Sequence, residues 1–164
     1  MSTPAVNSAL HTYLNNHLSG SSTGIQLIEH LIASAPDDQE RAFFQQLHTE
    51  ITADQQVLER VLSESGDEPG TLRKAGGALM EWLGRLKLTL DDVTHQRVAR
   101  LEALEVLSLG ILGKRALWRA LAIAGNPALR GHDFSSLERR AEDQHQRVEA
   151  RRLEAARRVL GGDA

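Results

Sequence analysis

A short polar stretch in the C-terminal half of the chain has residue types and a spacing that can bind metal. Residues 139–145 read RRAEDQH, so Glu142 and His145 stand three positions apart. On a helix this spacing places the carboxylate and the imidazole on one face, an arrangement that holds iron or manganese in some four-helix bundles. Glu-x-x-His also arises by chance in helices rich in these residues. The stretch is therefore either half of a metal site or an ordinary polar helix surface.

Four further ionisable residues lie on or beside apolar stripes. Glu50 and Asp54 stand four positions apart within one stripe, and His17 lies beside another. Glu105 is the only charge in the apolar run 103–112, which predicts a helix that is buried on most faces. A buried carboxylate needs a cation or a metal ion as its partner, because an unpaired buried charge is costly. We therefore expect each of these side chains to bind metal or to form an ion pair.

Composition limits the class of protein. The 164 residues are 41% hydrophobic and 25% charged, which allows a packed core in a single domain, 1–164. A net charge of −3 argues against nucleic-acid binding, and the absence of cysteine excludes disulfides and thiolate sites. The N-terminal sequence lacks the features of a signal peptide, and no apolar run approaches the roughly 18 residues of a membrane helix. We expect a soluble cytoplasmic protein.

Helix-forming residues dominate the chain, and a few turn signals divide it. Long helices are predicted at about 5–35, 38–65, 93–125 and 133–160, with a shorter helix near 71–88. Short connections make the first two long helices antiparallel, and the last two likewise. The segment between 65 and 93 is long enough to return along the bundle, so the second and third long helices should be parallel. The prediction is an all-α four-helix bundle with one long crossover.

Two stretches contain glycine inside predicted helices. Residues 19–24 read SGSSTG, for which we favour a helix over a flexible break because the apolar spacing continues on both sides. Gly110, Gly113 and Lys114 have part of the spacing of a phosphate loop, but no strand precedes them. At both places we expect the small residues to permit close packing of a neighbouring helix.

The predicted order of helices resembles that of the ferritin-like superfamily. More narrowly, the chain looks like a group of bacterial ferritin-like helical-bundle proteins to which no activity is attached. The stretches that carry this resemblance are YLNNHLSGSSTG (13–24), GRLKL (84–88), LEALEVLSLGILGKRALWRAL (101–121) and RRAEDQH (139–145). The resemblance covers most of the chain and implies a ferritin-like bundle with an extra short helix in the crossover. It does not imply a function, because fold does not fix function.

The resemblance also implies a set of metal ligands. The carboxylate site of the superfamily takes one Glu from each of two helices and Glu-x-x-His from each of the other two. The matching residues are Glu50, Glu105 or Glu102, and Glu142 with His145. This chain departs from the pattern, because it has only one Glu-x-x-His pair and no Glu at the centre of its first long helix. Two metal ions at a complete site could activate dioxygen.

Residue heights along the bundle favour ion pairs over one shared metal site. With a rise of 1.5 Å per residue, Glu142 and His145 lie about 12–15 Å from the level of Glu105, too far apart to bind one ion. The same heights predict three sets of ion pairs: Glu142 with Lys114 or Arg115, Glu105 or Glu50 with Arg151 or Arg152, and Asp54 with His17.

Two functions follow from these alternatives. The first prediction is a non-catalytic bundle without a cofactor that acts through self-association, as a homodimer, or through a partner protein. The alternative is an iron- or manganese-binding carboxylate protein with redox or metal-handling activity. Its ligands would be Asp54, His17, Glu142 and His145, or Glu50 and Glu105. The Arg residues of the last helix alternate with Glu, which indicates a solvated ion-pair surface instead of a nucleic-acid interface. The sequence names no substrate, and it leaves open whether the protein is an enzyme.

Overall fold

The structure is a computed structural model that describes residues 4–65 and 93–161. Within these ranges the chain is helical and has no strand. The helices are α1 (Pro4–Ala33), α2 (Asp38–Glu64), α4 (Val93–Ile123) and α5 (Phe134–Leu160), with a short 3-10 helix at Pro127–Leu129. The predicted all-α class is confirmed, and each long helix lies within a few residues of its predicted range. The short helix predicted near 71–88 lies outside the described residues.

Side-chain caps and turn residues set the ends of the helices. Asp37 caps α2, because its carboxylate accepts a hydrogen bond from the backbone N–H of Glu40 at 2.8 Å. Asp133 caps α5 in the same way through the N–H of Ser136 at 2.9 Å. Between α4 and α5, Gly125 has a φ of 61°, a conformation that favours glycine. These short connections turn the chain back on itself.

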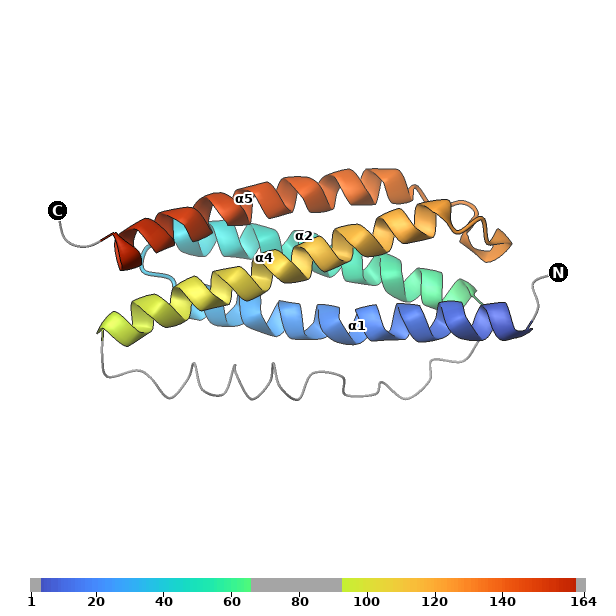
Figure 1. Ribbon diagram of the computed structural model, residues 1–164, viewed down its shortest axis with the longest axis horizontal. Helices are drawn as coiled ribbons and strands as arrows, with labels where there is room; N and C mark the ends of the chain where they lie inside the picture. Colours follow the sequence, from blue (N-terminus) through green and yellow to red (C-terminus); the bar gives the residue numbers. More distant parts are fainter. Residues whose placement is uncertain (1–3, 66–92, 162–164) are drawn as a thin grey trace.

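The four long helices form an elongated bundle with the expected directions. α1 and α2 are antiparallel, α4 and α5 are antiparallel, and α2 and α4 run the same way (Figure 1). α4 packs against both α5 and α1, and α1 packs against α2. Ion pairs connect α2 to α5. Side chains at the middle of one helix therefore lie at about the same height along the bundle as side chains at the middle of the others.

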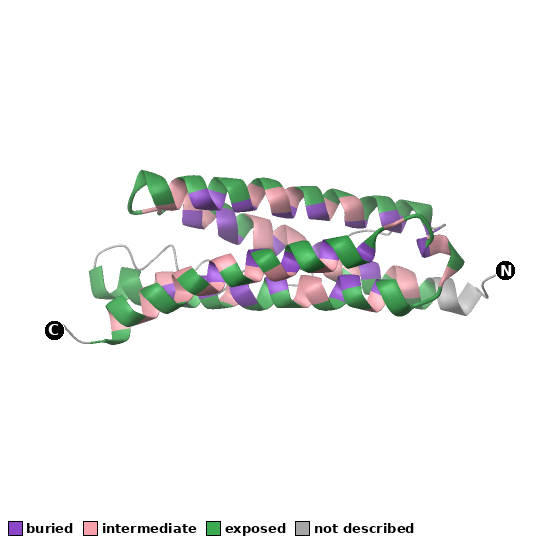
Figure 2. Cartoon of the chain, turned by 90° about the horizontal axis from the view of Figure 1, so that it is seen from above, coloured by how far each residue is buried: buried purple, intermediate pink, exposed green. Residues whose placement is uncertain are grey.

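The core runs along the bundle between the inner faces of the helices (Figure 2). Leu14, Phe44, Leu104 and Val148 are almost completely buried, one from each long helix. α4 is buried on one side only, because Leu109 is 67% exposed and Leu112 is 37% exposed. The expectation that this helix is buried on most faces is therefore wrong for the structure that the described residues form. None of the described helices is both long and apolar enough to cross a membrane.

Candidate functional site

A carboxylate at the centre of the bundle organises a group of charged side chains. Asp54 of α2 is only 1% exposed. Its Oδ2 accepts a hydrogen bond from the Lys114 ammonium of α4 at 2.6 Å, and its Oδ1 accepts one from the Arg140 guanidinium of α5. The amide of Gln144, also from α5, donates to Asp54 Oδ2 at 3.4 Å and accepts from Lys114. The buried negative charge is therefore satisfied by groups from two other helices.

Glu50 extends this group by one turn of α2. Its carboxylate accepts hydrogen bonds from Arg147 at 2.5 Å and from Gln144 at 3.3 Å. Burial alone would raise the pKa of Glu50, but the hydrogen bonds from Arg147 and Gln46 outweigh it and lower this pKa below its ordinary value. Burial also lowers the pKa of Lys114, and the attraction of Asp54 only partly opposes that effect.

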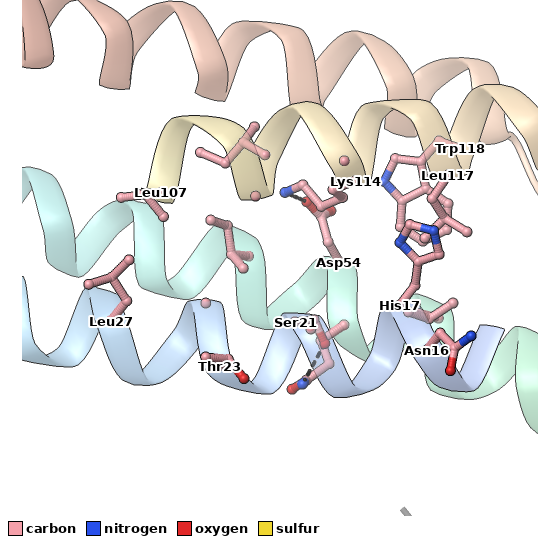
Figure 3. A pocket seen from close by; sticks show the side chains of 18 of the residues that line it. Asn16, His17, Ser21, Thr23, Leu27, Asp54, Leu107, Lys114, Leu117 and Trp118 are labelled. Carbon is pink, nitrogen blue, oxygen red and sulfur yellow. Dashed lines mark hydrogen bonds and ion pairs between the residues drawn. The ribbon is translucent and has the colours of Figure 1, made fainter. Parts of the chain in front are cut away.

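Two of the three predicted sets of ion pairs are present. Glu142 meets Arg115 at 2.6 Å, and Glu105 meets Arg152 at 3.5 Å. The predicted pair of Asp54 with His17 is wrong, because Asp54 turns toward Lys114 while His17 lies at one end of a cavity (Figure 3). The helix heights were predicted correctly, but the direction in which Asp54 faces was not.

The residues predicted to bind metal are distributed over several parts of the bundle. In residues 4–65 and 93–161, no three His, Asp or Glu side chains form a group that could hold a metal ion. Glu105 was expected inside the core, but its side chain is 48% exposed, on the outer side of α4. Glu142 and His145 are half-buried on α5. The structure brings Glu50 and Asp54 together through Gln144, and it does not bring the other candidates to them.

Gln144 was not predicted from the sequence, and Lys114 was predicted to pair with Glu142 instead of with Asp54. Gln144 is fully buried, and it lies three residues after Ala141 and four before Val148 on the buried stripe of α5. The same spacing identifies Lys114 between Ile111 and Trp118 on α4. Helical spacing of three and four residues could therefore have found both.

A cavity of about 260 Å³ lies beside the central group, between α1, α2 and α4 (Figure 3). Its walls are mostly apolar and come from all three helices, including Leu27, Ile51, Leu58, Leu107, Ile111 and Leu117. It reaches the surface between α1 and α4, where Gly20 and Gly110 are exposed. Asp54 and Lys114 line it as an existing ion pair.

Four helical glycines line this cavity: Gly20 and Gly24 on α1, and Gly110 and Gly113 on α4. A Cβ atom added at any of them would meet nothing within 4 Å in the described part of the chain. Among residues 4–65 and 93–161, no helix therefore packs closely against these glycines. Residues 19–24 are helical, as expected, although glycine inside a helix is about 1 kcal/mol less favourable than alanine. In the described part of the chain, the glycines leave the space between α1 and α4 open.

A few polar groups face the cavity among the apolar walls. The Gln55 amide donates to the Ser21 hydroxyl at 2.9 Å, and that hydroxyl donates to the carbonyl of Leu18 at 2.7 Å. Burial lowers the pKa of His17, so its imidazole is neutral at neutral pH. The Nε1 of Trp118 is buried and has no hydrogen-bond partner among the described residues. The site is thus an apolar cavity with a small number of hydrogen-bonding groups.

No protein-family model, curated protein sequence or solved structure matches this chain.

Proposed function

We propose that the protein is a non-catalytic binding bundle that takes up a small, mostly apolar molecule in the cavity between α1, α2 and α4. The observation that carries this proposal is the set of four helical glycines. Each is unfavourable for its helix, and no neighbouring helix in the described part of the chain requires any of them. Together they preserve a space that alanine or leucine would reduce.

The walls of the cavity support binding of an organic molecule. Ligand sites in proteins are mostly apolar, with a few polar groups that orient the ligand. A cavity of about 150 Å³ holds benzene, so in proportion the 260 Å³ here hold roughly ten non-hydrogen atoms, the size of two fused rings. The opening between Gly20 and Gly110 provides a route of entry.

The charged residues at the cavity support binding without chemistry. Asp54 uses both of its carboxylate oxygens in hydrogen bonds to cations. Lys114 donates to Asp54 and Gln144. A general base or nucleophile must be able to reach its substrate, and these two groups are committed to each other.

Binding of naphthalene, followed by isothermal titration calorimetry, tests the proposal with a variant that fills the cavity. Gly113→Leu places a larger side chain at a half-buried position of the wall, and we expect it to weaken binding at least tenfold. The control is Ala116→Leu, which adds volume to an exposed position of the same helix outside the cavity and should bind like the unmodified protein.

Thermal unfolding of the same variants shows whether the space is free. If it is, Gly113→Leu should unfold at the same temperature or higher, because leucine is a better helix former by about 0.8 kcal/mol. A marked loss of stability would mean that other parts of the chain occupy the space. That result, or naphthalene binding unchanged by Gly113→Leu, would contradict the proposal.

Two broader assignments belong with this proposal. The ferritin-like resemblance is supported by the parallel course of α2 and α4, which requires a long connection between them (Figure 1). Self-association as a homodimer is supported by exposed apolar side chains, among them Leu109, Ile123 and Leu160, and light scattering would measure it.

A further inference from the structure

We infer that the cavity selects ligands that carry a hydrogen-bond acceptor, and that the indole N–H of Trp118 is the group that recognises this acceptor. The ligand class is a small aromatic molecule of two fused rings with one neutral acceptor atom. This inference rests on the proposed binding function and adds the chemistry of the ligand to it.

Within the described part of the chain, the indole N–H of Trp118 is an unsatisfied buried donor. Trp118 is 1% exposed, and its Nε1 has no partner among the described residues. An indole nitrogen can only donate, and a buried donor without a partner is unfavourable by about 1–3 kcal/mol. Most buried polar groups in proteins are paired, so an unpaired donor on a residue that lines a cavity is a candidate partner for a ligand acceptor.

The Trp118 ring lines the cavity and stacks on a neighbouring aromatic ring. Trp118 lines the cavity at the end where His17 also lies, opposite the end formed by Leu27 and Leu107 (Figure 3). Its ring stacks on that of Phe134, with centroids 6.1 Å apart and planes inclined by 17°. This stacking fixes the ring, so the N–H is held in one direction before a ligand arrives. A preoriented donor loses little entropy when it binds.

Several of the other polar groups around the cavity already have partners. Ser21 both accepts from Gln55 and donates to a backbone carbonyl. Thr23 donates to the carbonyl of Ser19 at 3.4 Å, and Lys114 is paired with Asp54. His17 adds no positive charge at neutral pH, because burial lowers its pKa. A neutral acceptor therefore suits this end of the cavity better than an anion.

Quinoline and naphthalene form a matched pair of probes. They have the same ring size, and quinoline differs by one ring nitrogen that accepts a hydrogen bond. Each would be titrated into the full chain by calorimetry, at a pH where quinoline is uncharged. A hydrogen bond contributes about 0.5–1.5 kcal/mol, so we expect quinoline to bind roughly 2–12-fold more tightly than naphthalene.

The variant Trp118→Phe removes the donor and keeps an aromatic ring. We expect it to bind quinoline and naphthalene with equal affinity. His17→Phe is the control, and it should keep the preference for quinoline. Equal binding of both probes by the unmodified protein would overturn the inference but leave the proposed function intact, as would a preference that survives Trp118→Phe. Binding of neither probe would overturn both.

A second measurement does not depend on how the Trp118 variant folds. The chain has two tryptophans, Trp82 and Trp118, so ¹⁵N labelling gives two indole N–H signals that the variant Trp82→Phe assigns. Quinoline should move the Trp118 N–H signal downfield, as expected on formation of a hydrogen bond, and naphthalene should not. The same shift with both probes would show that ring contact, not acceptor recognition, moves the signal, and would contradict the inference.

Discussion

At the scale of single residues, the degree of burial distinguishes charged side chains that form ion pairs in the core from those that form ion pairs at the surface. Asp54 is 1% exposed and receives hydrogen bonds from α4 and α5. Glu105 also forms an ion pair, with Arg152, but its side chain is 48% exposed, so water competes with Arg152 for the carboxylate. Removing one member of a buried pair leaves the remaining charges uncompensated, whereas an exposed pair contributes little.

This contrast predicts different effects for two similar substitutions. Asp54→Asn should reduce the free energy of unfolding by about 3–5 kcal/mol, because Lys114 and Arg140 would lose their anionic partner. Glu105→Gln, the matched exposed change, should reduce it by less than about 1 kcal/mol. Urea unfolding of both variants measures the difference. Equal losses in the free energy of unfolding would show that the hydrogen bonds of Asp54 stabilise the folded protein no more than the exposed ion pair of Glu105 does.

At the scale of helices, three ion pairs connect α2 to α5. Asp54 meets Arg140, Glu50 meets Arg147, and Glu40 meets Arg151 at 3.4 Å. All three carboxylates come from α2 and all three cations from α5, so these ion pairs depend on the ionisation of the α2 carboxylates. Arg151 also lies over the ring of Phe43, 3.3 Å from its centroid, which adds a cation–π contact.

Acid should therefore weaken these ion pairs. The folded protein lowers the pKa of Glu50 below 4.5, its ordinary value. At pH values above 4.5, Glu50 is ionised in both the folded and the unfolded state, and its contribution to stability is complete. As the pH falls through the lowered pKa, the unfolded chain binds the proton first, and stability is lost. Glu50→Gln should be less stable at neutral pH and should lose less stability on acidification, as measured by urea unfolding across this range. An unchanged pH dependence would mean that Arg147 does not stabilise the carboxylate.

The helices and their directions could be predicted because their signals are local. Aspartate caps, glycine turns and apolar spacing are short-range features, and they placed α2 and α5 within a few residues. Pairs such as Glu142 with Arg115 followed from height along the bundle. The cavity did not follow, because a helical glycine can either admit a neighbouring backbone or leave a space. Only the distance between α1 and α4 decides between these, and no residue pattern encodes it.

At the scale of the whole molecule, the charges of the bundle are largely compensated within it. The four carboxylates proposed as metal ligands, Glu50, Asp54, Glu105 and Glu142, each meet a lysine or an arginine. Glu50 and Asp54 approach each other through Gln144, an amide that is a weaker metal ligand than a carboxylate. A metal ion at the centre would have to displace Lys114 or Arg140 from Asp54.

The metal content of the protein follows from this competition. We expect less than one equivalent of iron or manganese per chain when the untagged protein is expressed with both metals and purified without chelators, as measured by elemental analysis. Lys114→Met is the informative variant, because it removes a competing cation from Asp54 and leaves the neighbouring carboxylate of Glu50 in place. If that variant gained metal while the unmodified protein had none, the ion pair would be what excludes metal. About two equivalents in the unmodified protein would mean that its carboxylates exchange their cations for metal, and would replace the binding function proposed here with a metal-dependent one.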